Sequence, residues 1–275
     1  MGDDARQRIG WAEGTRRLAR ALGTEPRSVG AYAVEKLIAV REQPPPYRPD
    51  PDWESRFHAL LGAPWPCPES LACNRSWEAA RRRVESAGAR LGRHTYGAYS
   101  DGDRALTRAA WCAVRHLRPS TVLETGVAHG VSTRVILDAL DANADSSATL
   151  YSVDQPHLFH PELHRLTAVA VPPEQRIGGR WKYLPGSSRR RLPPLLRGLG
   201  AVDLFLHDSL HTERNTRFEM TRVAAALRPG GLMVIDDIST HRAFPRFTAA
   251  HPEFTALVAA SEDGEGLFGI AVRPR

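Results

Sequence analysis

Lysine is almost missing from this 275-residue chain. Only Lys36 and Lys182 are present, so the other 35 of its 37 basic residues are arginines, and with 31 acidic residues the net charge is +6. A basic chain invites a nucleic-acid partner. The arginine runs at 81–83 and 189–191, however, are not interleaved with aromatic residues as base-stacking surfaces are. We therefore expect solvated helix faces at these runs and no nucleic-acid partner.

Cysteine is scarce as well. The three cysteines, Cys67, Cys73 and Cys112, show no CxxC spacing, so no structural zinc site is expected, and a Cys67–Cys73 disulfide stays open. No apolar run approaches the roughly 18 residues that a membrane helix requires, and the acidic start at residues 1–4 lacks a signal-peptide core. These absences predict a cytoplasmic protein without a membrane partner.

The chain changes character near residue 95. Residues 1–95 carry helical patterns and a proline-rich connector at 44–51 but no chemical motif, which predicts a helical appendage that serves as a lid or an oligomer interface. In residues 96–275, helical patterns alternate with short apolar strands, expected at 121–124, 149–153, 181–184, 202–206, 232–235, 254–258 and 267–272. Such alternation predicts an α/β fold with a doubly wound parallel sheet, whose ligands bind at the carboxyl ends of the strands.

A glycine-containing turn, ETGVAHGVST at 124–133, follows the first of these strands. Gly126 and Gly130 let the backbone turn sharply and approach a ligand closely, just before a helix N-terminus. Their GxxxG spacing differs from the GxGxxG of dinucleotide-binding folds, which disfavours an NAD-dependent dehydrogenase. Glu124 ends an otherwise apolar strand, where a carboxylate requires a polar partner.

The next two strands end in residues suited to a nucleoside. Asp154 follows the second strand, where an acid is positioned to accept hydrogen bonds from ribose hydroxyls, with a helix N-cap as the structural alternative. Gly186 and Ser187 lie in a polar turn after the third strand, which can face an adenine edge.

Three carboxylates follow the fourth and fifth strands. Asp208 ends the fourth strand, and Asp236 and Asp237 end the fifth. Carboxylates so close together repel one another unless a cation or shared protons intervene. Oxygen ligands with open positions suit Mg²⁺ better than zinc. The alternative is structural, with Asp237 as a helix cap and Asp208 as a solvated turn residue.

Together these motifs resemble the class I S-adenosylmethionine (SAM)-dependent methyltransferases. The resemblance covers residues 96–275 and is carried by ETGVAHGVST at 124–133, SVDQP at 152–156, HDSLH at 207–211 and LRPGGLMVIDD at 227–237. Within that class the chain looks like the bacterial metal-dependent sugar O-methyltransferases of the macrocin and mycinamicin type and the cephalosporin-hydroxylase-like proteins. The resemblance implies a Rossmann-like, seven-stranded methyltransferase sheet and a homo-oligomer.

The resemblance also implies SAM as the cofactor and Mg²⁺ on Asp208, Asp236 and Asp237. It places the amino-acid end of SAM in the turn at 124–130, the ribose at Asp154 and the adenine at the turn of Gly186. The residues expected to touch the cofactor are Glu124, Thr125, Gly126, Ala128, Gly130, Ser132, Asp154, Gly186, Ser187, Asp208 and Tyr99. One departure concerns the metal: related sequences often read Asp-Gly-Asp-His after the fourth strand, and here Leu210 stands in place of the second acid.

The expected reaction is methyl transfer to a hydroxyl of a small-molecule acceptor, a sugar or other polyol in a secondary metabolite or glycolipid. An alcohol is a poor nucleophile until it loses its proton, and we expect Asp208 or His211 to remove it, with His241 as a further candidate. Two alternatives stay open. One is a metal-independent methyltransferase that acts on a nitrogen or a carboxylate of a small molecule, and the other is an RNA-binding methyltransferase, suggested by the arginines.

Overall fold

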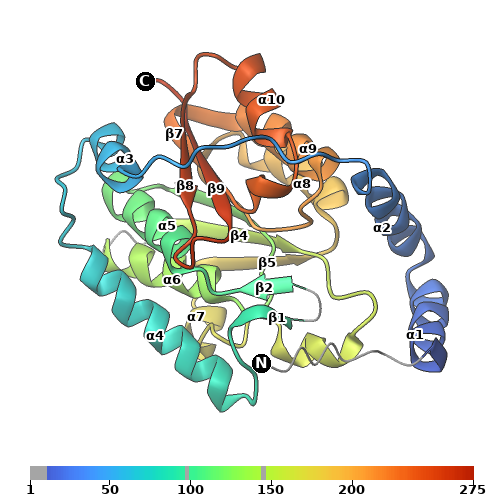
Figure 1. Ribbon diagram of the computed structural model, residues 1–275. Helices are drawn as coiled ribbons and strands as arrows, with labels where there is room; N and C mark the ends of the chain where they lie inside the picture. The colour runs from blue at the N-terminus through green and yellow to red at the C-terminus, as the bar shows by residue number, and fades with distance from the viewer. Residues whose placement is uncertain (1–10, 97–98, 144–146) are drawn as a thin grey trace, which may run out of the picture.

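A seven-stranded sheet forms the centre of the molecule, seen here in a computed structural model that describes residues 11–96, 99–143 and 147–275 (Figure 1). Its strands are β3 (Thr121–Thr125), β4 (Thr149–Asp154), β5 (Trp181–Pro185), β6 (Val202–His207), β7 (Leu227–Ile235), β8 (Thr255–Ala260) and β9 (Leu267–Val272). The strand order is β5-β4-β3-β6-β7-β9-β8, and β9 runs antiparallel to both of its neighbours. All seven predicted strands are present in one doubly wound sheet, and the antiparallel β9 is its departure from the predicted parallel arrangement.

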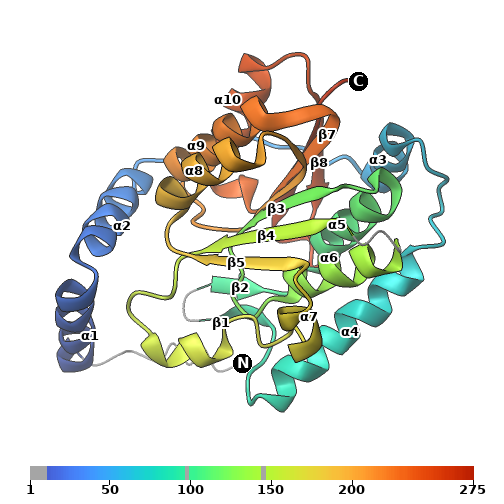
Figure 2. The ribbon, with the colours of Figure 1, turned by 180° about the vertical axis from the view of Figure 1, so that it is seen from behind.

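Helices cover both faces of this sheet (Figures 1 and 2). They are α1 (Trp11–Thr24), α2 (Pro26–Ala39), α3 (Trp53–Leu61), α4 (Ser70–Ser86), α5 (Arg104–Leu117), α6 (Val131–Ala142), α7 (Pro173–Ile177), α8 (Ser188–Leu199), α9 (Glu213–Ala226) and α10 (Ala243–Ala250). Two short 3-10 helices, η1 (Pro161–Leu166) and η2 (Ile238–Thr240), follow β4 and β7.

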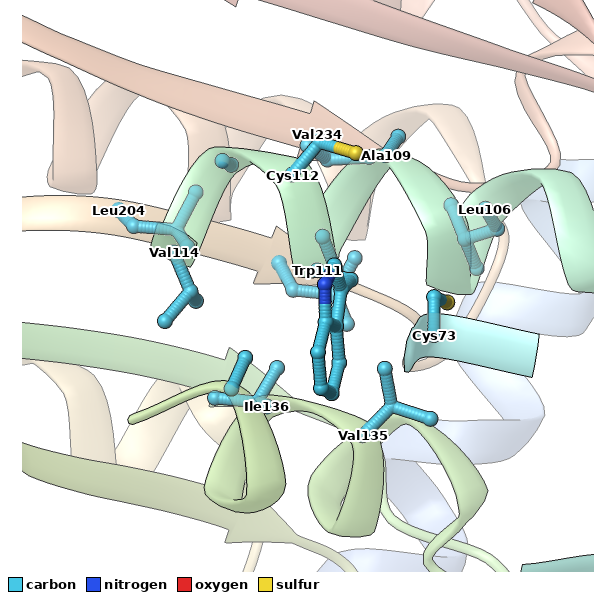
Figure 3. Packing of buried hydrophobic residues seen from close by; sticks show 14 of the residues in the cluster. Cys73, Leu106, Ala109, Trp111, Cys112, Val114, Val135, Ile136, Leu204 and Val234 are labelled. Atoms are coloured by element: carbon cyan, nitrogen blue, oxygen red, sulfur yellow. The ribbon is translucent and has the colours of Figure 1, made fainter. Parts of the chain in front are cut away.

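Side chains of successive strand residues enter two separate hydrophobic clusters. Val122 packs in the cluster under α3, α4, α5 and α6, whereas its neighbour Leu123 packs in the cluster under α8, α9 and α10. This alternation follows from the two-residue period of a strand and explains why both faces are apolar. Figure 3 shows Trp111 of α5 pointing toward Val135 and Ile136 of α6 within the first cluster.

A two-stranded hairpin, β1 (Gly92–Tyr96) and β2 (Tyr99–Asp101), follows α4. The observed helix α4 ends at Ser86, and Gly88 follows with a φ of 78°, a left-handed conformation that stops a helix. The predicted boundary between residues 95 and 96 falls inside β1.

The N-terminal helices separate into two groups. Helices α3 and α4 share the hydrophobic cluster of α5 and α6, so they belong to one layer of the sheet domain. Helices α1 and α2 lie along another side of the molecule, and the segment between α2 and α3 crosses to the far edge, where the Asp50 amide donates to the Val258 carbonyl at 2.8 Å (Figure 1). The assignment of all residues 1–95 to one lid or oligomer interface stays a prediction. None of the helices in the described part of the chain is both long and apolar enough to cross a bilayer.

We expect Phe57→Ala to lower the free energy of unfolding by about 3–5 kcal/mol, because this α3 side chain is fully buried and its loss leaves a cavity in the shared cluster. Urea denaturation followed by circular dichroism measures the change. The matched control is Leu71→Ala on α4, whose side chain is 68% exposed and should change stability by less than about 0.5 kcal/mol. A loss below about 1 kcal/mol for Phe57→Ala, or a separate unfolding step for α3, would contradict a shared core.

Candidate active site

The candidate site lies where the sheet changes winding direction. The chain passes from β3 outward to β4 and β5, then returns to β6 on the other side of β3, so the carboxyl ends of β3 and β6 border a crevice of the kind that binds ligands in such sheets. Here the two strand-end turns touch. The Asp208 amide donates to the Thr125 carbonyl at 2.8 Å, and a Cβ on Gly126, whose φ is 87°, would lie 1.8 Å from the Asp208 carbonyl oxygen. Only glycine fits at position 126.

Glu124 is completely buried at the end of β3. Its carboxylate accepts hydrogen bonds from the hydroxyls of Ser132 at 2.7 Å, Thr133 at 2.7 Å and Ser152 at 2.6 Å. Burial raises the pKa of Glu124 to about 7, although the three hydroxyls oppose the shift. These contacts supply the polar partner that a buried strand-end acid requires.

Three side chains expected at the cofactor face the protein interior instead. Glu124 and Ser132 bond to each other, and the Thr125 hydroxyl donates to Glu219 at 2.6 Å. Successive side chains of a strand point to opposite faces of the sheet. The side chains of Glu124 and Thr125 therefore enter the protein interior on opposite sides of β3. In this arrangement these side chains fix the turn, and their direct contact with SAM stays a prediction.

Asp154 is the acid that faces the glycine turn. Its carboxylate accepts from the Val127 amide at 3.2 Å and from the Tyr183 hydroxyl at 3.3 Å. Burial raises the pKa of Asp154 to about 6, and the charge of Asp208 adds to the rise. Because the Gly186 amide donates to the Asp154 carbonyl at 2.7 Å, the turn after β5 is fixed beside this carboxylate.

The remaining expected cofactor residues differ in position. Ala128 adopts a left-handed φ of 45° in the turn, and its carbonyl accepts from the Ala168 amide at 2.8 Å. A Cβ on Gly130 would lie 2.8 Å from the Ala168 Cα, so this glycine is required for packing. Ser187 precedes α8 and makes no side-chain cap. The side chain of Tyr99 lies outside the described residues.

Asp208, His211 and Asp236 converge at the ends of β6 and β7, with their ligand atoms within 4.8 Å of one another. His211 lies between two acids: its Nε2 is 3.6 Å from an Asp208 carboxylate oxygen, and its Nδ1 is 3.2 Å from an Asp237 oxygen. Asp237 is outside the convergent group, contrary to the expected ligand set, because its left-handed backbone, with a φ of 47°, turns its carboxylate to His211 and Ser239.

Charge determines the protonation of this group. Burial alone would lower the pKa of His211, but its contacts with Asp208 and Asp237 and the charge of Asp236 raise it well above its ordinary value. The same imidazole holds the pKa of Asp237 at about 2 despite burial. Burial and the charge of Asp208 raise the pKa of Asp236 well above its ordinary value. The neighbouring acids therefore favour the protonated form of His211 as long as no other cation neutralises them.

His241 does not reach the site. It is fully buried; its Nε2 lies 3.1 Å from the Thr216 hydroxyl, and its Nδ1 accepts from the Ala243 amide. Burial lowers the pKa of His241 to about 4. Both ring nitrogens are occupied and the ring is buried, which favours a structural role for His241, and its role as a base stays a prediction.

Glu219 of α9 is an important residue that the sequence reasoning missed. Its buried carboxylate accepts from four side chains: Thr125 at 2.6 Å, His207 Nδ1 at 2.7 Å, Ser209 at 2.8 Å and Asn215 at 2.9 Å. Burial opposes the charge, but His207 and the hydroxyls lower the pKa of Glu219 to about 2. The signal in the sequence was an acid on the apolar face of a helix, between Thr216 and Val223.

A second missed residue joins α2 to the site loop. Glu35 is buried, accepts from the Thr212 hydroxyl at 2.9 Å, and pairs with Arg189 at 2.9 Å and Arg214 at 3.2 Å. No local pattern marks it, because its partners lie more than 150 residues away.

In the arginine run at 81–83, Arg81 pairs with acids of its own helix at 2.9 and 2.6 Å, as a solvated helix face would.

Comparisons with known proteins agree with this geometry. Residues 123–238 match the family model of a methyltransferase domain. The structure is similar to the O-methyltransferase TomG from Streptomyces achromogenes, which is involved in tomaymycin synthesis and was solved with SAM. The two chains are 16% identical in sequence, the match covers 73% of this chain and 90% of TomG, and the TM-score is 0.53. It is equally similar to an O-methyltransferase from Bacillus cereus in complex with SAH, at 16% identity over 80% and 97% with a TM-score of 0.53.

No curated protein sequence matches the chain. The family model identifies a methyltransferase domain at residues 123–238, and the solved structures show that its fold is the one O-methyltransferases use. The predicted methyltransferase fold is confirmed, and the family model supports the predicted enzyme class.

Glu219→Gln should lower the free energy of unfolding by about 1.5–3 kcal/mol at pH 7, because it removes a buried charge that holds several hydrogen bonds. The pKa of Glu219, about 2, lies below its ordinary 4.5, so its contribution is present above pH 4.5 and is lost as the pH falls toward 2. Urea unfolding at a series of pH values should show a shallower acid decline for the variant. The control is Glu174→Gln, an exposed residue of α7. An unchanged acid profile for Glu219→Gln would refute this account.

Proposed function

We propose that this chain is an O-methyltransferase that transfers the methyl group of SAM to a hydroxyl of a sugar or other polyol, in a secondary metabolite or a glycolipid. The observation that carries the proposal is the convergence of Asp208, His211 and Asp236 directly beside the glycine turn at Gly126. This juxtaposition brings an acceptor-activating group next to the expected position of the reactive methyl. The matched methyltransferase family model supports the reaction type.

In the proposed cofactor site, the backbone of the turn at Gly126 and Ala128 holds the amino-acid end of SAM. Asp154 accepts from the ribose hydroxyls, and the turn of Gly186 and Ser187 borders the adenine. Alignment is the main task of these residues, since the sulfonium already supplies an activated methyl group.

The residues at the ends of β6 and β7 fit a divalent cation. Two carboxylates and an imidazole have their ligand atoms within 4.8 Å of one another, and the Nε2 of His211 is buried without a hydrogen-bond partner. We propose Mg²⁺ held by Asp208 and Asp236 with His211, while Asp237 orients His211 through its Nδ1. When bound, the ion supplies Lewis acidity that favours loss of the acceptor hydroxyl proton. Because the Nε2 lone pair of His211 would be given to the ion, Asp208 is the proposed proton acceptor.

A metal-independent methyltransferase is the second candidate. It is favoured by the position of His211, whose positive charge between Asp208 and Asp237 already balances part of the negative charge of the group. The two candidates differ in their dependence on added cations.

The face of α1 and α2 supports the proposed homo-oligomer. Six large apolar side chains of α1, α2 and the C-cap of α2 are more than 40% exposed, namely Leu18, Leu22, Val34, Leu37, Ile38 and Val40. Exposed apolar residues gathered on two adjacent helices are typical of a protein–protein contact surface.

The cofactor proposal predicts that calorimetry detects binding of S-adenosylhomocysteine and that Asp154→Ala weakens it by about 10–100-fold. This range corresponds to the loss of a hydrogen bond to a charged group, about 1.5–3 kcal/mol. Asp52→Ala, at an exposed carboxylate before α3, is the control and should bind as wild type does. Absence of binding by the folded wild-type protein would end the proposal.

The metal proposal predicts that EDTA abolishes methyl transfer to a polyol acceptor, that Mg²⁺ restores it, and that Asp236→Asn lowers kcat/KM by about 100-fold or more, the equivalent of several kcal/mol. Mass spectrometry of glycosylated acceptors follows the reaction. Binding of S-adenosylhomocysteine should be unchanged in Asp236→Asn, which separates metal from cofactor effects. Full activity in EDTA and in Asp236→Asn would favour the metal-independent candidate.

A further inference from the structure

A second cluster of metal-ligating side chains lies in the layer of α3 and α5, outside the strand-end site. His58 of α3, Cys67 of the following loop and Cys112 of α5 are all buried, and one ligand atom of each lies within 4.8 Å of the others. His116, one turn after Cys112, brings its Nε2 to 3.2 Å from the Cys67 Sγ. The convergent group therefore contains two thiols and one imidazole, and His116 lies beside it in contact with Cys67.

The orientation of His58 is that of a metal ligand. Its Nδ1 lies 2.7 Å from the carbonyl of Glu54, a partner that can only accept, so Nδ1 carries the hydrogen and Nε2 has a free lone pair. That Nε2 is buried and has no hydrogen-bond partner. Buried polar atoms are almost always paired, and histidine ligands commonly donate their other ring nitrogen to a backbone carbonyl. An unpaired lone pair beside two thiols is explained by a cation.

The spacing of the other ligands agrees with a tetrahedral ion. Cys112 and His116 are four residues apart on α5 and so lie on the same face of the helix. The Sγ atoms of Cys67 and Cys112 are 4.0 Å apart. Zinc bonds of about 2.3 Å to sulfur and about 2.0–2.1 Å to nitrogen place two sulfurs about 3.8 Å apart, and a sulfur and a nitrogen about 3.6 Å apart, at tetrahedral angles. The observed sulfur–sulfur distance of 4.0 Å is slightly longer than its ideal value, and the Cys67–His116 sulfur–nitrogen distance of 3.2 Å is slightly shorter.

We propose that His58, Cys67 and Cys112 form a structural zinc site, with a small movement of the His116 ring, whose Nε2 already contacts Cys67, supplying the fourth ligand. Two thiolates and two imidazoles close the tetrahedral shell, which leaves no position for a substrate. Binding converts both thiols to thiolates and releases their two protons to solvent, with no redox change. The ion fastens the loop between α3 and α4 to α5. A disulfide does not account for the cluster, because all three cysteines are free and 4.0 Å is about twice a sulfur–sulfur bond.

The test uses the full chain, first as purified without chelator and then stripped of metal and loaded with Co²⁺. We expect about one zinc per chain by elemental analysis, and with Co²⁺ a thiolate-to-cobalt charge-transfer band together with the strong visible bands of a tetrahedral ion. Cys67→Ser and Cys112→Ser should each weaken the charge-transfer band, and the double variant should abolish it. Cys73→Ser is the matched control, since Cys73 is buried in the same hydrophobic cluster but is not in the ligand group.

Asp236→Asn separates this site from the strand-end acids and should leave the charge-transfer band intact. If the serine variants fail to fold, the wild-type protein still decides: Zn²⁺ should raise the Tm of the metal-free chain, and the Co²⁺ form should show thiolate bands. The proposal is overturned if Co²⁺ binds without a charge-transfer band, if the band persists in the double serine variant, or if it disappears in Asp236→Asn. A metal-free protein with a Cys67–Cys112 disulfide would overturn it equally.

Discussion

The contact between the turns after β3 and β6 determines the geometry of the whole site. Gly126 and the Asp208 carbonyl approach so closely that no side chain fits between them, and the Asp208 amide bonds to the end of β3. The cofactor turn and the acidic group therefore move as one unit. Beneath them, Glu124 and Glu219 tie the turns to α6 and α9 on opposite faces of the sheet. Such support from packed elements is what holds reacting groups in register.

Electrostatics at this edge favours the arrival of positive charge. Burial raises the pKa values of Glu124, Asp154 and Asp236, and mutual repulsion with Asp208 adds to each. Among the described residues, His211 is the basic side chain that lies within this set. A divalent ion and the sulfonium of SAM are both cations, so either would relieve repulsion that the protein alone leaves in place. The repulsion among these carboxylates lowers the folding stability and makes the site complementary to its proposed cationic ligands.

The sequence predicts features that depend on local pattern and reveals little that depends on distant partners. The strands follow from apolar runs, and Asp154, Asp208 and Asp236 follow from the rule that ligands gather at strand ends. Three features of the structure have no local signal in the sequence. The left-handed backbone of Asp237 keeps its carboxylate out of the convergent group, in which His211 stands instead. The partners of Glu35 are far along the chain. The His58 and Cys67 pair is separated by 44 residues from Cys112 and His116, so no paired-cysteine spacing marks the proposed zinc site.

The buried carboxylate of Glu35 has a consequence for synthesis on the ribosome. Its partner Thr212 lies 177 residues later, so α2 has no buried position until the loop before α9 has emerged. At about 5–20 residues per second this delay is about 10–35 s. Closing so long a loop also costs entropy that local helix contacts do not. Helix α2 is therefore made long before it can dock, and the loop that carries His211 gains its contact with Glu35 only when it does.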